Sequence, residues 1–223
     1  MSEPLPTLVD YDPPTEPYLN VVYVDDDLLV LDKPSGLLSV PGRHPSLWDS
    51  IRHRARKQWP TAEMVHRLDK DTSGLILMAL NKRAHGRLGI QFEKRTTKKS
   101  YVARVAGVLD KEEGLIDLPL MTDWEHKPRQ KVDLEHGRPA QTRWQVIARE
   151  TNATRLRLFP LTGRTHQLRV HMLAVGHVIL GDAFYADQRA FAAADRLQLH
   201  AEELEFVHPT TGETCRFVVP APF

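Results

Sequence analysis

The sequence predicts an α+β fold, built on a mixed and mainly antiparallel sheet with flanking helices. Two observations favour this class over a doubly wound parallel sheet. Short apolar runs typical of strands outnumber the stretches with helical spacing, and tight turns join many of these runs. The chain has 223 residues, 41% of them apolar and 26% charged, which is enough to bury a sizeable core in one domain.

The chain begins with a segment unlike the rest. Residues 1–20 contain five prolines and are rich in acidic residues, so they predict an extended arm before a single domain at 21–223. Apolar runs at 21–24 and 28–31 then enclose three consecutive aspartates. This pattern predicts a pair of strands joined by an acidic turn.

Two helices are expected in the first half of the domain. Ser46, with Asp49 three positions later, has the form of a capping box and predicts a helix that Pro60 ends. Asn81 can cap a second helix, in which every fourth residue from Ala84 is apolar and faces inward. The continuous apolar run at 75–80 lies between these helices and predicts a buried strand.

The second half is expected to consist mainly of strands. These strands cover residues 101–108, 141–148, 154–161, 197–207 and 214–219. Helical spacing from Leu168 to Val175 predicts one more helix, which ends at Gly176. Residues 111–139 show little periodicity and are expected to form a loop.

The charge is unevenly distributed, although the net charge is only +1. Residues 1–32 hold eight acidic residues and no Lys or Arg, whereas residues 33–200 hold 29 Lys and Arg against 17 Asp and Glu. The basic residues are densest at 82–104. Such a run indicates either a solvated helix face or a surface that neutralises phosphates, and charge alone does not decide between them.

Several classes of protein are excluded by what the sequence lacks. Cys215 is the only cysteine, which excludes a disulfide scaffold. It lies in an expected C-terminal strand with no sign of a base paired to it, which argues against thiol catalysis. The eleven histidines show no zinc-ligand spacing, and neither a Walker loop nor a dinucleotide-binding Gly-rich motif occurs. No apolar run reaches the ~18 residues of a membrane helix, and the first residues do not form an export signal. We therefore expect a cytoplasmic protein without a metal or another cofactor.

Three segments place polar residues next to expected strands and helices. They are His-Arg-Leu-Asp-Lys-Asp-Thr-Ser-Gly at 66–74, Lys-Lys-Ser-Tyr-Val-Ala at 98–103, and Thr-Gly-Arg-Thr-His-Gln-Leu-Arg at 162–169. Each has an ordinary structural interpretation: an Asx-type turn, a core tyrosine with a solvated hydroxyl, and a helix start with solvated arginines. Taken singly, none of the segments indicates a function.

Together and in this order, the three segments resemble the motifs of the RluA family of pseudouridine synthases. The likeness extends to residues 32–37, 119–120, 137–142 and 180–185, and therefore covers most of the chain from about Val21 onward. Many members of this family carry an S4 RNA-binding domain before the matching region. Only about twenty residues precede it here, so no S4 domain is expected.

The resemblance implies a cleft across the sheet and a specific chemistry. Pseudouridine synthases break the bond between N1 of uracil and C1′ of its ribose, turn the base and join C5 to C1′. The resemblance implies that three residues are catalytic: Asp69 supplies the carboxylate, Arg164 pairs with it, and Tyr101 stacks on the uracil and helps to remove the C5 proton. Leu168 is expected to close the other side of the base pocket. The sequence leaves open whether Asp69 attacks C1′, removes a proton from C2′ or stabilises positive charge on the sugar.

The resemblance also implies how RNA is held. Arg67 is expected to fill the space that a flipped uridine leaves in its stack. His66, Arg95, Lys98 and Lys99 are expected to contact the RNA, within a basic surface that includes residues 82–99. Four more basic residues are expected on this surface, namely Arg52, Arg54, Arg56 and Lys57.

The implied substrates are a uridine in the tRNA anticodon loop and a loop uridine of 23S rRNA, acted on by a monomer. Three alternatives remain at this point. The first is an RNA-binding or remodelling protein without catalytic activity, and the second is a synthase for a different rRNA site. The third is a hydrolase that uses Asp71 as a second carboxylate, two residues from Asp69.

Overall fold

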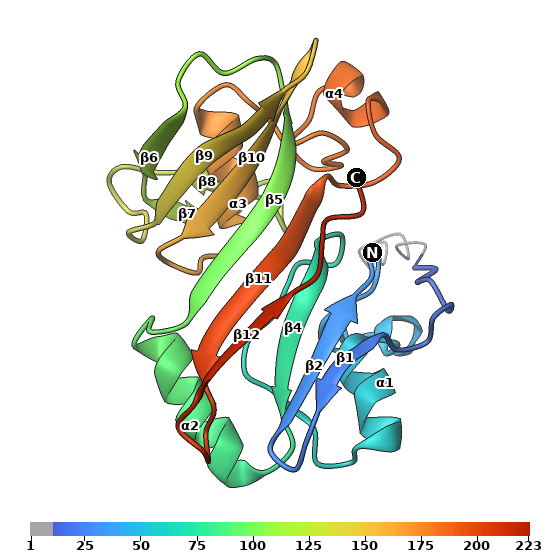
Figure 1. Cartoon of the computed structure of the whole chain (residues 1–223). Coiled ribbons are helices and arrows are strands. Elements are labelled where there is room, and N and C mark those ends of the chain that lie inside the picture. Colours follow the sequence, from blue (N-terminus) through green and yellow to red (C-terminus); the bar gives the residue numbers. More distant parts are fainter. Residues whose placement is uncertain (1–10) are drawn as a thin grey trace.

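A computed structural model describes residues 11–223 and arranges most of their strands in one ten-stranded sheet (Figure 1). The strands are β1 (Val21–Val24), β2 (Leu28–Lys33), β3 (Glu63–Met64), β4 (Ser73–Ala79), β5 (Lys98–Ala106), β6 (Glu113–Asp117), β7 (Leu120–Thr122), β8 (Gln130–Val132), β9 (Gln141–Arg149), β10 (Ala153–Pro160), β11 (Leu199–Val207) and β12 (Thr214–Val218). The helices are α1 (Ile51–Gln58), α2 (Lys82–Glu93), α3 (Gln167–Ala174) and α4 (Gln188–Ala192).

The main sheet has the order β1-β2-β4-β11-β5-β10-β9-β6, with β3 paired to β4 and β12 paired to β11. All of its strand pairs are antiparallel except β4 and β11, which run parallel over a short stretch. At this crossing Gly74 has a φ of +108°, and a Cβ there would lie 2.3 Å from the carbonyl oxygen of Ala201. Glycine is therefore required where the two halves of the sheet meet. The predicted mixed, mainly antiparallel α+β fold is confirmed.

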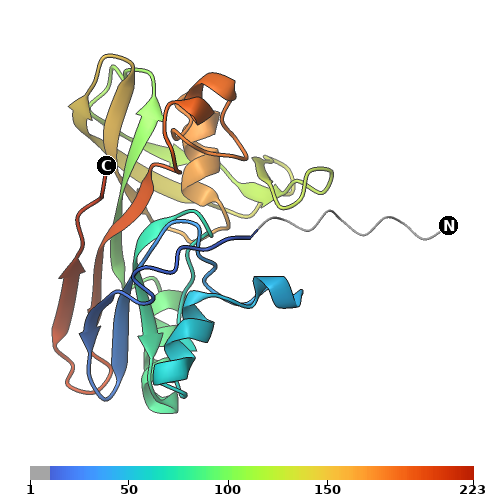
Figure 2. The same cartoon turned by 90° about the vertical axis from the view of Figure 1, so that its right-hand side faces the viewer.

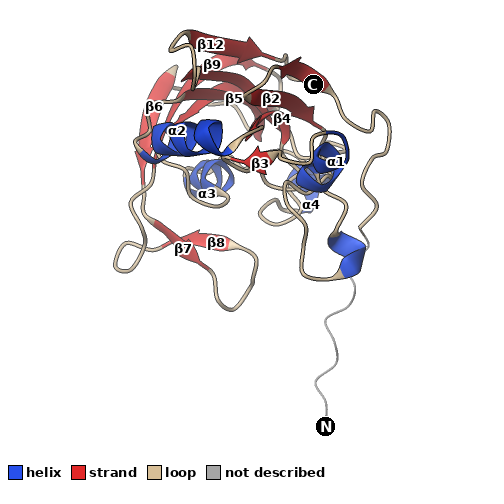
Figure 3. Ribbon diagram, turned by 90° about the horizontal axis from the view of Figure 1, so that it is seen from below, coloured by secondary structure: helices blue, strands red, loops and turns tan. Residues whose placement is uncertain are grey.

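Helices α1 and α3 and the β7–β8 hairpin lie on one side of the sheet (Figures 2 and 3). Strand β4 is buried along its whole length. Ile76 and Met78 pack in a cluster with Ile51 and Ala55 of α1, whereas the alternating residues of β4 pack in another cluster with Phe206. A strand covered on both faces has no polar side, which explains its continuous apolar sequence.

Most of the predicted elements form where the sequence placed them. The strand pair at β1 and β2 and the hairpin of β9 and β10 are confirmed. The cap of α2 is also confirmed, because the Asn81 side chain accepts a hydrogen bond of 2.9 Å from the backbone N–H of Ala84. Strand β5 begins earlier than predicted, so Lys98 and Lys99 belong to the strand itself.

The predicted start of the first helix is wrong. Pro45–Leu47 forms only a short 3-10 turn, and α1 begins at Ile51 with Ser50 as its cap. The Asp49 carboxylate does not complete a capping box because it binds the guanidinium of Arg54 through two hydrogen bonds of 2.8 and 2.6 Å. A bidentate pair with a guanidinium gives the carboxylate two hydrogen bonds to a cation, against one bond to a backbone N–H in a capping box, so it decides the local geometry.

The predicted loop at 111–139 is also incorrect, because it contains β6, β7 and β8. Strand β6 is stabilised by its pairing with β9, and the β7–β8 hairpin packs against α3 around Leu120 and Val170. Strands this short carry no periodic signal, so only their partners reveal them.

Part of the predicted N-terminal arm lies outside the described residues. Residues 11–20 pack against α1 and are not extended away from the domain. The Tyr11 hydroxyl donates a 2.7 Å hydrogen bond to the carbonyl of Asp49, and the Arg54 guanidinium lies 4.8 Å from the Tyr18 ring centroid. Within residues 11–223, no helix is long and apolar enough to cross a membrane.

Candidate active site

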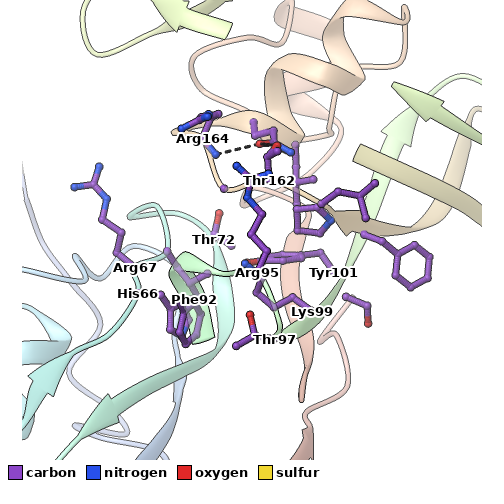
Figure 4. A pocket seen from close by; sticks show the side chains of 18 of the residues that line it. His66, Arg67, Thr72, Phe92, Arg95, Thr97, Lys99, Tyr101, Thr162 and Arg164 are labelled. Carbon is purple, nitrogen blue, oxygen red and sulfur yellow. Dashed lines mark hydrogen bonds between the residues drawn. The ribbon is translucent and has the colours of Figure 1, made fainter. Parts of the chain in front are cut away.

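The three polar segments singled out in the sequence line one cavity of about 850 Å³ (Figure 4). The first is the loop before β4, the second is the start of β5, and the third leads into α3. Tyr101 packs against the apolar clusters of both halves of the molecule, so the cavity lies where these halves meet. The tertiary structure thus brings together segments that are about 30 and 60 residues apart in the chain.

The loop that carries Asp69 is held by its backbone. Ser39 donates a 2.6 Å hydrogen bond to the carbonyl of Leu68, and Ser35 donates one of 2.7 Å to the carbonyl of Asp71. The N–H of Gly36 donates to the carbonyl of Lys70. All three partners follow β2, and Ser35 and Gly36 belong to the segment at 32–37 that is part of the family resemblance. Their role is to hold the backbone on either side of Asp69.

A buried lysine completes this support. The Lys33 ammonium is fully buried and donates to three carbonyls, those of Pro34, Leu37 and Lys70, at 2.9, 2.7 and 2.8 Å. Burial lowers the pKa of Lys33 to about 7, although the carboxylates of Asp71 and Asp69 oppose this shift. Its three donors are matched by three acceptors, which is the arrangement that a buried ammonium requires.

The cation beside Asp69 is Arg169, and the expected pairing with Arg164 is wrong. Nη1 of Arg169 lies 3.5 Å from Oδ2 of Asp69. The Arg164 Nε instead donates a 3.1 Å hydrogen bond to the carbonyl of Pro139. Both arginines belong to one sequence motif, and helix α3 determines which of them is directed at the carboxylate.

Arg169 is itself fixed by Asp182. Nε and Nη2 of Arg169 donate hydrogen bonds of 2.7 and 2.6 Å to the two carboxylate oxygens, and both side chains are almost completely buried. Burial alone would lower the pKa of Arg169, but these bonds more than offset it and keep that pKa raised. The rings of Phe184 and Tyr185 also lie 5.1 and 5.2 Å from the guanidinium. Arg169 is therefore a rigid, permanent positive charge.

Sequence reasoning missed this support for Asp69. Residues 180–185 were part of the resemblance, yet nothing in their spacing shows that Asp182 faces Arg169. The pairing forms because the segment after α3 folds back and buries Asp182 against Arg169.

Tyr101 and Leu168 line the cavity from β5 and α3, as expected for two walls of a base pocket. Burial, together with the nearby Asp69 carboxylate, strongly raises the pKa of the Tyr101 hydroxyl. The hydroxyl is therefore protonated at neutral pH, and the ring is an uncharged surface.

His66 and Arg67 point in different directions (Figure 4). The His66 ring stacks on Phe92 with 4.7 Å between centroids, and its Nε2 accepts a 2.9 Å hydrogen bond from the backbone N–H of Leu77. Burial lowers the pKa of His66 to about 3, so the ring is neutral. These contacts give His66 a structural role in the wall of the cavity. Arg67 is exposed and lines the cavity without a described partner for its side chain.

The basic residues in and just before the second segment differ in their exposure and in their contacts. Arg95 is exposed at the rim, but Lys98 forms a 2.6 Å ion pair with Glu205. Lys99 is half-buried, with its Nζ 5.6 Å from the centroid of the Phe92 ring. The expected placement of Arg54 on the basic surface is wrong, because its side chain is fully buried and paired with Asp49.

The cavity as a whole favours an anionic ligand. Seven Arg and Lys residues line it, against Asp69, Glu93 and Glu203. Asp71 does not line the cavity and pairs with Lys70 at 3.4 Å, so the hydrolase alternative loses its proposed second carboxylate. Among residues 11–223, no cluster of three or more His, Cys, Asp and Glu side chains has the geometry to hold a metal ion.

A carboxylate held by an arginine, beside a tyrosine ring in a basic cleft across this sheet, defines a class of enzyme. Residues 27–174 match the family model of RNA pseudouridylate synthases, and the chain belongs to this family. The predicted family, fold and enzyme class are thereby confirmed: the chain is an RNA pseudouridine synthase.

Named relatives agree over almost the whole chain. It is 52% identical over 217 residues to the dual-specificity RNA pseudouridine synthase RluA of Pasteurella multocida, covering 97% of this chain and 99% of the relative. It is 53% identical over 215 residues to RluA of Escherichia coli strain K12, covering 96% and 98%. Among solved structures, human RNA pseudouridylate synthase domain containing 1 is 30% identical, with a TM-score of 0.80 and coverage of 95% and 87%.

Proposed function

We propose that this enzyme converts loop uridines to pseudouridine in both tRNA and 23S rRNA, with Asp69 as the catalytic carboxylate. The observation that carries the proposal is the placement of Asp69 beside the fixed Arg169, in a basic cavity walled by Tyr101 and Leu168. The match to dual-specificity relatives along nearly the full length supports the pair of substrates. Action on these RNAs would place the enzyme in the cytoplasm.

The reaction needs an ionised carboxylate at the sugar. The N1–C1′ bond breaks, the uracil turns within the cavity, and C5 bonds to C1′. C5 then loses its proton while N1 gains one, so the RNA keeps its mass. Arg169 places a positive charge 3.5 Å from the Asp69 carboxylate, and the loop backbone holds the carboxylate in place. The neutral ring of Tyr101 and the side chain of Leu168 provide apolar surfaces between which a planar base fits.

The target base must leave its stack before it can reach Asp69. Unstacking costs a few kcal/mol and is least costly in a loop, which favours loop uridines as substrates. Arg67 precedes Asp69 by two residues and extends from the cavity rim without a described partner. Its guanidinium is suited to stack on the neighbouring bases in the place of the flipped uridine.

The test is release of tritium from RNA labelled at C5 of uridine. Wild type, Asp69→Asn and Asp69→Ala are each incubated with an anticodon stem-loop and with a 23S rRNA fragment, and RNA binding is measured in parallel. We expect wild type to release tritium from both RNAs, and both variants to bind RNA without releasing it. Mass spectrometry of the product should show an unchanged RNA mass.

Other outcomes would change the proposal in specific ways. Release from only one RNA would contradict dual specificity, and release from neither would indicate another rRNA site or a binding protein. Near-normal release by Asp69→Asn would remove the catalytic role of this carboxylate. A free uracil product would indicate hydrolysis.

A further inference from the structure

We infer that His166 is a positioning residue for Asp69: it acts as a neutral N–H donor whose tautomer is set by Tyr185. This inference rests on the proposed role of Asp69 and deepens it. His166 lines the cavity but is neither the catalytic carboxylate nor its arginine partner. Three features of the structure support the inference: the backbone conformation of His166, its hydrogen bond to Tyr185, and the position of its Nε2 near the Asp69 carboxylate.

The backbone at His166 is strained. Its φ of +53° and ψ of 17° lie in the left-handed region, although the residue is not glycine. Such a conformation is unfavourable for a residue with a Cβ and is concentrated at functional sites. The residue caps α3 without a capping hydrogen bond from its side chain, so the side chain serves another purpose.

A hydrogen-bond chain determines where the imidazole proton lies. The backbone N–H of Gln130 can only donate, and it donates a 2.8 Å bond to the Tyr185 hydroxyl oxygen. Burial raises the pKa of Tyr185 to about 12, so the hydroxyl keeps its hydrogen. Nδ1 of His166, at 2.7 Å, is the described acceptor within reach of that hydrogen. Because Nδ1 accepts, the proton of the neutral ring lies on Nε2.

Nε2 of His166 faces the catalytic carboxylate, 3.9 Å from Oδ2 of Asp69. Arg169 approaches the same oxygen at 3.5 Å. Both distances are long, as is common for catalytic contacts before the substrate binds. Arg169 and the Nε2 of His166 thus both lie beside the same oxygen of Asp69.

Burial favours the neutral form of His166. Burial lowers the pKa of His166; Asp69 and Asp182 oppose this shift, whereas Arg169 and Arg67 reinforce it. A neutral donor orients Asp69 without adding a second full positive charge to it. The carboxylate therefore keeps its reactivity at the sugar while its direction is restricted.

The chain of contacts also reaches beyond the cavity. Gln130 is the first residue of β8, so the seating of the β7–β8 hairpin determines the position of Tyr185 and, through it, of His166. Asp69 is thereby connected to a hairpin about 50 to 60 residues away in the sequence.

The kinetic test compares His166→Gln with His166→Asn. Glutamine places an N–H near the position of Nε2, whereas asparagine replaces only the Nδ1 side but suits the left-handed backbone better. We expect His166→Asn to lower the single-turnover rate about 100-fold, as a misdirected catalytic group would, with RNA affinity unchanged. His166→Gln should retain clearly more activity. The reverse order would show that only the backbone matters and would overturn the inference.

The spectroscopic test uses protein labelled with ¹⁵N-histidine. Wild-type His166 should show the Nε2–H pattern, and His171 provides a reference because its Nε2 contacts the carbonyl of Leu118, which can only accept. In Tyr185→Phe the His166 signal should change while that of His171 does not. An Nδ1–H pattern in wild type would overturn the inference even if isomerisation is normal. Because this readout needs no turnover, it separates failure here from failure of the proposed function.

Discussion

Replacing Asp182 with asparagine should destabilise the native state by about 3–5 kcal/mol, because it leaves the Arg169 cation buried without a counter-ion. Asp182 is fully buried and Arg169 nearly so, and two hydrogen bonds of 2.7 and 2.6 Å join them. For a chain of this length, the loss corresponds to a fall in Tm of roughly 6–20 °C.

The amide cannot replace the carboxylate at this position. Oδ1 of Asp182 also accepts hydrogen bonds from the backbone N–H groups of Phe184 and Tyr185, so the asparagine oxygen is held there. Its NH₂ group then faces Nε of Arg169, which is another donor. The variant therefore loses an ionic hydrogen bond and gains a contact between two donors.

Urea unfolding followed by circular dichroism measures the effect. Arg216→Gln is the matched control, because it breaks an exposed pair with Glu203 and should leave the free energy of unfolding nearly unchanged. The double variant Arg169→Met/Asp182→Leu should regain part of the lost stability, since an apolar pair replaces a buried ion pair, although the N–H groups of Phe184 and Tyr185 lose their acceptor. Its pseudouridine formation should remain abolished, because no cation is left beside Asp69. A loss below about 1 kcal/mol in Asp182→Asn would refute the reasoning.

Two further predictions follow from other residues of the site. Arg164→Ala should weaken RNA binding and reduce its salt dependence. The rate at saturating RNA should stay nearly unchanged, because Arg164 contacts Pro139 and not Asp69. A lower rate at unchanged RNA affinity would contradict this prediction. The pKa of His66 is about 3 in the native state, below its unfolded value of about 6.5. Between about pH 3 and about pH 6.5 the unfolded chain therefore binds one proton more than the native protein at this residue. The free energy of unfolding falls there by up to about 1.4 kcal/mol for each unit by which the pH decreases. Urea unfolding at about pH 7 and about pH 5 should show that the free energy of unfolding depends less on pH in His66→Gln than in wild type. The control is His53→Gln, at an exposed position, which should behave like wild type. Equal pH dependence in all three proteins would show that His66 is not the group responsible.

Much of the fold follows from local patterns. The apolar run of β4 is a buried strand because neighbours cover both of its faces, and Asn81 caps α2 because a side-chain amide oxygen can satisfy a free N–H at any helix start. The start of α1 was misplaced because Asp49 has a stronger partner, Arg54, five residues further on. Strand β6 was not predicted because its pairing with β9 is what stabilises it. Its five residues contain no local pattern from which that partner could be inferred.

The sequence by itself determined the family, the mainly antiparallel α+β fold and the three segments that form the cavity, because these depend on residue types in a fixed order. Only the tertiary structure decided that Arg169, and not Arg164, accompanies Asp69, and that Asp182 holds Arg169. The physical reason is direction: two arginines five residues apart have the same chemistry, and the orientation of α3 selects which of them points at the carboxylate. Burial, too, was decided only by the tertiary structure. Lys33 and Arg54 are residue types that usually lie on a protein surface, but both are fully buried here.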